Sequence, residues 1–98
     1  MEAGVDFVWD EQKRLLNLRK HGLDFVDRAA LFRGPMVAWP DVRFDYGEAR
    51  YIAVGLIRDR VAVAVYAEVP GAVRVISMRK ASKHEEASYF ENLSRLQD

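Results

Sequence analysis

Hydrophobic residues recur at helical spacing near both ends of the chain and at strand spacing between them. A short strand is predicted over residues 7–9. Asp10 then provides a favourable N-cap for a helix, and Gly22 supplies the left-handed residue that ends it. The apolar side of this predicted helix consists of three leucines, Leu15, Leu16 and Leu18. A second helix is predicted over residues 25–33, beginning after Asp24 and stopping at a Gly-Pro pair.

The middle of the chain favours strands. Valine and other β-formers alternate with small residues, and turn sequences separate the runs. The predicted strands are residues 36–41, 49–57, 61–69 and 73–81. Ser82 and Glu85 form a capping box that opens a last helix. Its apolar residues are Phe90, Leu93 and Leu96. This order of elements predicts an α+β fold in which helices pack on one face of a small antiparallel sheet, with a C-terminal helix.

The strand at residues 73–81 carries several cations, and strict alternation predicts where they point. One face should present Arg74, Ile76, Met78 and Lys80. The other face should present Val75, Ser77 and Arg79. Strict alternation therefore predicts that Arg74 and Arg79 lie on opposite faces of the sheet.

Composition indicates one small soluble domain. The 98 residues are half hydrophobic, so residues 1–98 are interpreted as a single domain with one core. The absence of cysteine excludes a disulfide scaffold and thiolate zinc sites. The N-terminus does not resemble a signal peptide, and the longest apolar run, residues 61–67, is too short for a membrane helix. We therefore expect a cytoplasmic protein with no membrane partner.

The charge is balanced overall but unevenly distributed. Fifteen Lys and Arg residues offset fifteen Asp and Glu residues, so nucleic-acid binding through bulk positive charge is excluded. Residues 73–84 contain four cations and no acid, whereas the first eleven residues contain four acids and no cation. Any binding of nucleic acid must therefore come from a local patch.

The sequence "RKHG" at residues 19–22 allows two interpretations. Cationic residues at a helix C-terminus complement the helix dipole and need no other role. Alternatively, Arg19 and Lys20 hold a phosphate while His21 moves a proton, because histidine changes charge near neutral pH. The only other histidine, His84, falls in the first turn of the last helix, where a solvated side chain is expected.

Three stretches together resemble the BrnT toxin family. The first is "WDEQKRLLNLRKHG", in which the matching residues are Trp9, Asp10, Lys13, Asn17, Lys20, His21 and Gly22. The second is "GEARYIAVG", which matches through Gly47, Glu48, Arg50, Tyr51 and Gly55. The third is "VRVISMRKASKHEEASY", which ends at Tyr89. Two departures are Met78, where the family usually has alanine, and Glu86, where basic residues are common.

The resemblance implies a RelE-like fold and a type II toxin that cleaves RNA and arrests translation. It implies no cofactor and no metal. It also implies a cognate BrnA-like antitoxin, a ribbon-helix-helix protein encoded beside the toxin. That antitoxin silences the toxin, and the complex contacts operator DNA only through the antitoxin.

Metal-free RNA cleavage needs a base, groups that hold the phosphate, and a proton for the leaving oxygen. The expected catalytic residues are His21, Glu48, Arg50 and Arg79. The expected RNA-binding residues are Arg19, Lys20, Arg74, Lys80 and Lys83. Glu48 is an alternative to His21 as the base. Arg79 allows a second interpretation, a structural ion pair with Glu48 or Glu85.

Two further questions stay open at this point. Four aromatic residues could stack on RNA bases or could simply belong to the core: Trp9, Trp39, Tyr51 and Tyr66. The whole chain could also be a non-catalytic toxin-fold module that acts with its antitoxin in transcriptional autoregulation. Zero net charge and Glu86 keep that alternative open.

Overall fold

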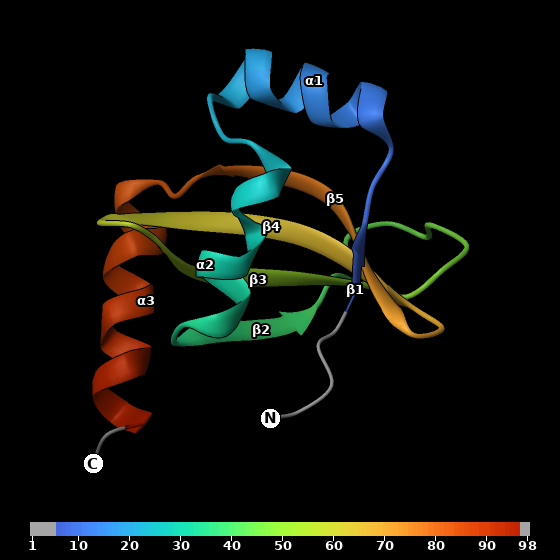
Figure 1. Cartoon of the computed structure of the whole chain (residues 1–98). Helices are drawn as coiled ribbons and strands as arrows, with labels where there is room; N and C mark the ends of the chain where they lie inside the picture. The colour runs from blue at the N-terminus through green and yellow to red at the C-terminus, as the bar shows by residue number, and fades with distance from the viewer. Residues whose placement is uncertain (1–5, 97–98) are drawn as a thin grey trace.

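The computed structural model describes residues 6–96 and contains one five-stranded sheet with three helices (Figure 1). In chain order the elements are β1 (Asp6–Val8), α1 (Glu11–His21), the 3₁₀ turn η1 (Phe25–Asp27), α2 (Arg28–Arg33), β2 (Met36–Pro40), β3 (Arg50–Ile57), β4 (Arg60–Val69), β5 (Ala72–Lys80) and α3 (Lys83–Leu96). The predicted α+β fold with a C-terminal helix is confirmed. Three parts of the predicted single domain lie outside the described residues, namely residues 1–5, residues 97–98 and the side chain of Leu96.

The sheet has the strand order β1-β5-β4-β3-β2. Strands β2 to β5 form an antiparallel meander, as predicted. Short turns connect β3 to β4 and β4 to β5, and a loop over residues 41–49 connects β2 to β3. Strand β1 adds in parallel to the start of β5, where Phe7 is the register partner of Val73. Since β1 pairs only with residues 72–74, the rest of this edge of β5 needs other partners.

The local signals at the helix ends act as predicted. Asp10 accepts hydrogen bonds from the first backbone N–H groups of α1, and Gly22 ends the helix at φ +73°. The Ser82–Glu85 capping box closes with distances of 2.8 and 3.1 Å. The predicted second helix is divided into η1 and α2, with the Asp24 side chain accepting from the N–H of Val26.

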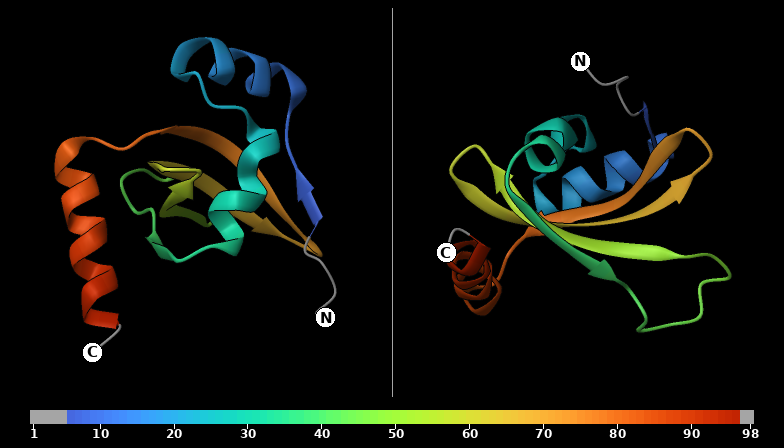
Figure 2. Two further views of the ribbon diagram at one scale, coloured as in Figure 1. Left: turned by 60° about the vertical axis from the view of Figure 1, so that its left-hand side comes forward. Right: turned by 90° about the horizontal axis from the view of Figure 1, so that it is seen from below.

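The two faces of the sheet are covered by different helices (Figure 2). On the first, here called the α1/α2 face, the main core residues include Phe25 and Leu31, which are completely buried. The opposite face is here called the α3 face. There, Tyr89 and Leu93 of α3 pack in a cluster with Val54, Val61 and Val63. The prediction that helices pack on one face of the sheet therefore holds for α1 and α2. Helix α3 packs on the opposite face.

Helices on the α1/α2 face approach the sheet closely at one point. Gly55 of β3 lies beneath α2, and a Cβ placed there would meet the Cγ of Leu31 at 3.1 Å and its carbonyl oxygen at 3.2 Å. A side chain at this position would push α2 away from the sheet. The small residue therefore lets Leu31 reach its fully buried position.

Helix α1 does not bury the apolar side that the sequence predicts. Leu16 is 60% exposed, and Leu15 and Leu18 are exposed as well. The buried residue of α1 is instead Asn17. Its Nδ2 donates to the carbonyl of Met78 at 2.8 Å, and the N–H of Met78 donates to its Oδ1 at 3.2 Å. Asn17 thus satisfies backbone groups on the part of β5 that β1 does not reach.

A bulge in β5 overturns the predicted alternation of residues 73–81. Val65 is opposite Ser77, but the next residue of β4, Tyr66, is opposite Val75. Ile76 is therefore an extra residue in the ladder. As a result Val75 and Met78 share the α1/α2 core, and Arg74 and Arg79 both point to the α3 face. The prediction that these two arginines lie on opposite faces is wrong.

Candidate functional site

A groove of about 440 Å³ lies on the α3 face, beside the part of the sheet that α3 covers. Its floor consists of strand residues, Ile52, Val63, Val65 and Ser77. Its rim combines residues from a helix end, the edge strand, a loop, β5 and α3, namely His21, Trp39, Arg43, Arg79 and Glu85. The groove therefore brings together two of the predicted catalytic residues, His21 and Arg79, which are 58 positions apart in sequence.

Arg79 is held by Glu85. Its Nη1 and Nη2 donate to the two carboxylate oxygens, each at 2.8 Å, and Nη1 also donates to the carbonyl of Lys80. These hydrogen bonds raise the pKa of Arg79 and lower that of Glu85 to about 2. The three bonds leave the Nε hydrogen and one Nη2 hydrogen on the side edge of the guanidinium. The ion pair is thus compatible with a second partner for Arg79.

Arg43 faces the same groove and was not among the residues selected from the sequence. Its Nε and Nη2 donate to the two oxygens of Asp41, each at 2.8 Å. Tyr46 donates a third bond to this buried carboxylate, at 3.0 Å. The hydrogen bonds from Arg43 lower the pKa of Asp41 and raise that of Arg43. They leave both Nη1 hydrogens and one Nη2 hydrogen, on the end of the guanidinium.

The groove can therefore hold an anion between two oriented guanidinium groups. Arg43 and Arg79 line the same groove, and the positive charge of Arg43 opposes the rise in the pKa of Arg79. The guanidinium group of arginine can donate two parallel hydrogen bonds to a phosphate. Here a carboxylate already fixes the orientation of each guanidinium group. The imidazole of His21 and the hydroxyl of Ser77 add groups that exchange protons.

The other predicted catalytic residues form a separate cluster near the starts of β3 and β5. Glu48 accepts from the Nε of Arg50 at 3.0 Å and also pairs with Arg74. The guanidinium of Arg50 stacks on the ring of Tyr46, 4.2 Å from its centroid. Hydrogen bonds from Arg50, then from Arg74, lower the pKa of Glu48. A carboxylate held in this way accepts protons poorly, so a positioning role suits Glu48 better than a base.

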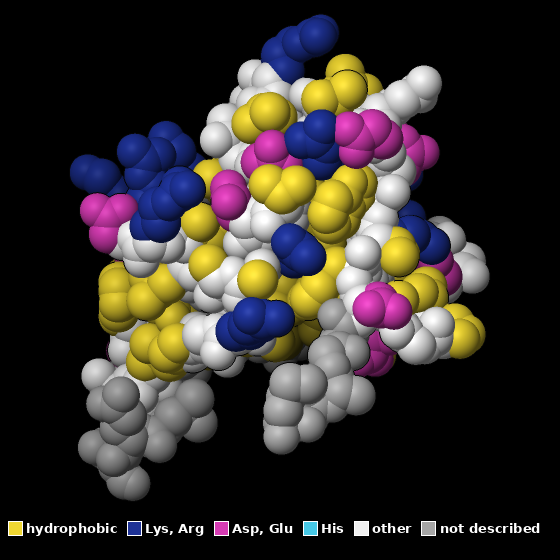
Figure 3. Space-filling model, viewed as in Figure 1, with side chains coloured by type: hydrophobic (Ala, Val, Ile, Leu, Met, Phe, Trp, Pro, Cys, Tyr) yellow, Lys and Arg dark blue, Asp and Glu magenta, His cyan; other side chains and the backbone are white. Residues whose placement is uncertain are grey.

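The remaining predicted RNA-binding residues are exposed and line neither the groove nor this cluster. Arg19 and Lys20 lie on α1. Lys80 and Lys83 lie near the start of α3, where the β3–β4 turn adds the exposed residues Arg58 and Arg60. Figure 3 shows Lys and Arg side chains gathered in this part of the surface. This region, here called the basic end, could contact an RNA backbone.

The structure separates the four aromatic candidates. Trp9 packs edge-on against Phe25, Tyr51 stacks on Tyr66, and all three candidates belong to the α1/α2 core or its margin. Trp39 alone among the four is exposed, at 44% of its surface, and it lines the groove. The core interpretation therefore suits Trp9, Tyr51 and Tyr66, and Trp39 is the one available to stack on a base.

The described residues give less support to a metal site or a membrane-spanning helix. Within residues 6–96, no three His, Asp or Glu side chains gather closely enough to hold a metal ion. None of the described helices is long and apolar enough to cross a membrane. The fold and the groove thus define a small α+β protein with a site suited to a phosphate group.

The particular family follows from comparison with known sequences. Residues 9–85 match the family described as "Ribonuclease toxin, BrnT, of type II toxin-antitoxin system". The chain belongs to this family, as its three motifs predicted. The match supports ribonuclease activity in general and the existence of an antitoxin partner. No curated protein matches the chain closely enough to add a characterised relative.

Proposed function

We propose that this toxin is a metal-independent endoribonuclease that cleaves RNA in the groove and thereby arrests translation. The observation that supports this most is the pair Arg43 and Arg79, each oriented by a carboxylate, facing one groove with His21. Preorganised charge is usually the largest contribution to catalysis at a phosphate, because no reorganisation is needed as negative charge develops.

The proposed reaction is attack of a ribose 2′-oxygen on the adjacent phosphorus. His21 takes the proton of the 2′-hydroxyl, and the new P–O bond forms as the bond to the 5′-oxygen breaks. Arg43 and Arg79 donate to the non-bridging oxygens, whose negative charge increases in the transition state. Water at the open groove protonates the leaving 5′-oxygen. The products are a 2′,3′-cyclic phosphate and a 5′-hydroxyl end.

The RNA strand would extend from the groove along the α3 face. Arg74 lies on that face of β5, and Arg50 lies on the same face of β3. The Glu48 cluster would then contact a neighbouring phosphate, with Glu48 orienting both arginines. At the other end, Lys80 and Lys83 in the basic end would attract the strand, and Arg19 and Lys20 would act from α1.

The family implies an antitoxin, and we propose that it is a BrnA-like ribbon-helix-helix protein. It would cover the groove and present a segment of complementary charge to the basic end, which is rich in cations. The complex would contact operator DNA through the antitoxin alone. Translation is the proposed target, so the toxin would act in the cytoplasm.

Cleavage of a labelled single-stranded RNA by the purified toxin in the presence of EDTA tests this proposal. We expect cleavage to persist in EDTA, to yield cyclic phosphate ends, and to stop when the antitoxin is added. Expression of the toxin alone should halt growth of a bacterial host, and co-expression of the antitoxin should restore it. Cleavage that requires Mg²⁺ would contradict the proposed mechanism.

The non-catalytic module remains the second candidate because of one observation. Asp41 and Glu85 place two carboxylates beside the two groove arginines, so this part of the site has little net charge. A groove of that kind could bind its antitoxin without cleaving RNA. A folded toxin that forms the complex but leaves RNA intact and growth unimpaired would favour this candidate.

A further inference from the structure

A second pocket, of about 170 Å³, lies beneath α3 and adjoins the groove. The two spaces share three lining residues, Trp39, Val63 and Glu85. We propose that this pocket, here called the base pocket, holds the nucleobase next to the cleaved bond and sets the sequence preference of the toxin. The proposal rests on the proposed function and names the part of the substrate that this pocket recognises.

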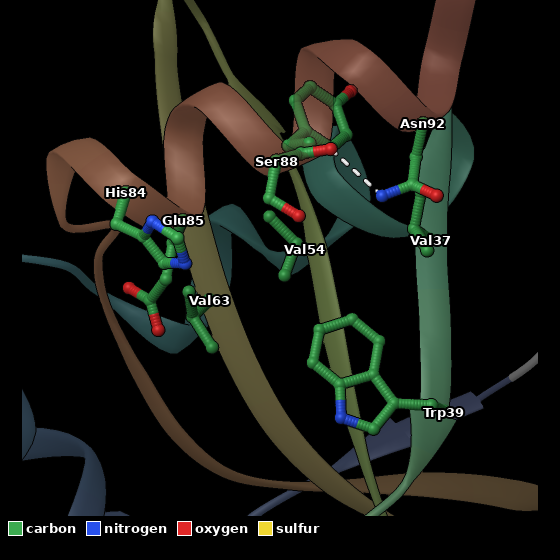
Figure 4. A pocket seen from close by; sticks show the side chains of 9 residues that line it. Val37, Trp39, Val54, Val63, His84, Glu85, Ser88 and Asn92 are labelled. Carbon is green, nitrogen blue, oxygen red and sulfur yellow. Dashed lines mark hydrogen bonds between the residues drawn. The ribbon is translucent and has the colours of Figure 1, made fainter. Parts of the chain in front are cut away.

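The floor of the base pocket is apolar and one of its walls is aromatic. Val54 and Val63 form the floor, and both are nearly completely buried. The indole of Trp39 stands beside them, open to the pocket (Figure 4). Bases of single-stranded RNA are recognised by stacking on rings of this kind, because every base has an apolar face.

The opposite side of the base pocket is polar and belongs to α3. Glu85, Ser88 and Asn92 recur at intervals of three and four residues, so they lie on one side of the helix. Figure 4 shows Ser88 and His84 with their side chains toward the space above Trp39. A base stacked on Trp39 would thus have hydroxyl, imidazole and amide groups near its edge.

Asn92 offers a donor and an acceptor to such a base. Its Nδ2 donates one hydrogen bond to the carbonyl of Ser88, at 2.8 Å. An amide has two Nδ2 hydrogens and an Oδ1 acceptor, so the second hydrogen and the oxygen can still recognise a ligand. Tyr89 has a different role, since its hydroxyl donates to the carbonyl of Pro35 at 2.7 Å and anchors α3 over the sheet.

The charges indicate a base in this pocket and a phosphate in the groove. The carboxylate of Glu85 already accepts from both Nη atoms of Arg79. Arg43 and Arg79 line the groove and not the base pocket, which presents valines, an indole, and hydroxyl, imidazole and amide groups. A nucleotide can satisfy both spaces at once, because its phosphate and its base are covalently joined.

Sequencing of the ends produced from a random single-stranded RNA library tests the base pocket. Wild-type toxin should show a base preference at one position adjoining the cleaved bond. Trp39→Ala should raise KM roughly 5- to 150-fold, the range for losing one stacked base, and flatten that preference. Trp39→Phe retains a ring and should keep most of the preference. Asn92→Ala should flatten the preference with a smaller rise in KM.

Leu16→Ala is the matched control, because it also truncates an exposed hydrophobic side chain but lies on α1, away from both spaces. It should leave KM and the preference unchanged. Thermal unfolding of each variant establishes that it is folded. If Trp39→Ala does not fold, Trp39→Phe and Asn92→Ala still test the prediction.

A binding measurement separates failure of this inference from failure of the proposed function. In a Trp9→Phe, Arg79→Ala background, Trp39 is the remaining tryptophan, and cleavage is impaired. An unstructured oligoribonucleotide should quench its fluorescence, whether or not the wild-type toxin cleaves RNA. No quenching, or an unchanged base preference in Trp39→Ala, overturns the inference. If Trp39→Ala weakens antitoxin binding alone, the pocket belongs to the antitoxin interface.

Discussion

The two faces of the sheet are built from the same strands but have opposite properties. On the α1/α2 face, Phe25, Leu31 and Met78 are completely buried and fill the space between helices and strands. On the α3 face, one helix covers only part of the strands, and the rest is the groove with its arginines. Alternate residues of a strand thus separate folding from chemistry, and substitutions on the two faces should have different consequences.

The largest effect is expected from the α1/α2 face. Phe25→Ala should lower the free energy of unfolding by about 3–5 kcal/mol, because it removes a buried ring and leaves a cavity. Chemical denaturation, followed by circular dichroism, measures this loss. Leu16→Ala, which truncates an exposed leucine of α1, is the control and should change stability by less than about 0.5 kcal/mol. Equal stability of the two variants would show that this face is not the main core.

The α3 face should respond in activity and hardly in stability. Arg79→Ala should reduce RNA cleavage about 100- to 1000-fold, the usual scale for one preorganised donor. Arg43→Ala is the exception on this face: it should reduce cleavage too, but it should also lower stability, because it leaves the buried carboxylate of Asp41 without its cation. Arg79→Lys keeps the positive charge but cannot donate two parallel hydrogen bonds from a planar group, so partial activity is expected. Cleavage rate and melting temperature should be measured on the same preparations.

Arg95→Ala is the matched control for these arginine variants. It removes an exposed arginine that is paired with Glu91 at the far end of α3, and it should leave cleavage unchanged. If Arg79 is instead mainly a structural partner of Glu85, the result reverses. The melting temperature of Arg79→Ala would then fall while its folded fraction cleaved RNA normally.

A smaller loss of stability is expected at the boundary between the two faces. Asn17→Ala leaves the N–H and carbonyl of Met78 without their side-chain partner, at a cost of about 1–3 kcal/mol. Hydrogen exchange at the Met78 amide should accelerate more than exchange in β3. Gln12→Ala, at an exposed position of the same helix, is the control. Unchanged protection of Met78 would mean that water replaces Asn17 without loss.

The smallest effect is expected in the stability of the fold at low pH. Glu85 has a pKa of about 2 in the folded chain, below its ordinary 4.5, mainly because Arg79 donates to it. A lowered pKa stabilises the fold above about pH 4.5, and this contribution is lost as the pH falls from 4.5 to 2. Glu85→Gln should remove this contribution to stability. The loss should be less than about 1 kcal/mol, because the ion pair with Arg79 is partly exposed. Denaturation at pH 7 and pH 3 measures the difference, with the exposed Glu86→Gln as control.

Strand periods and helix caps could be predicted from the sequence because they depend on neighbouring residues. The Ser82–Glu85 box and the Gly22 cap are examples of such local signals. The side of α1 that faces the protein could not be predicted in this way. Three leucines indicated an apolar contact, but the edge of β5 needed hydrogen bonds, and Asn17 supplied them. Tertiary hydrogen bonding outweighed the local pattern.

The residues of the candidate site could likewise be predicted only in part. The family motifs selected His21 and Arg79, and the fold places both at one groove. Arg43 lies in a loop with no periodic pattern, and only the buried Asp41 orients it toward the groove. No sequence pattern distinguished Trp39 from the other aromatic residues, although it alone among the four is exposed in the fold. Such features arise from packing between distant segments, so a motif does not reveal them.

The extra residue in β5 has a consequence for how this protein can change over evolutionary time. Substituting Ile76 would alter one side chain, whereas deleting it would restore strict alternation along the strand. Val75 and Ser77 would then be adjacent, opposite Tyr66 and Val65, so that Arg74 and Arg79 stayed on the α3 face and Val75 and Met78 stayed in the core. Drawing Ile76 into a regular ladder would instead exchange inside for outside on one side of it. Relatives should therefore tolerate replacement or loss of this residue, provided that any extra residue stays outside the regular ladder. The inherited feature is the face on which each arginine lies, more than the number or identity of the residues that separate the two.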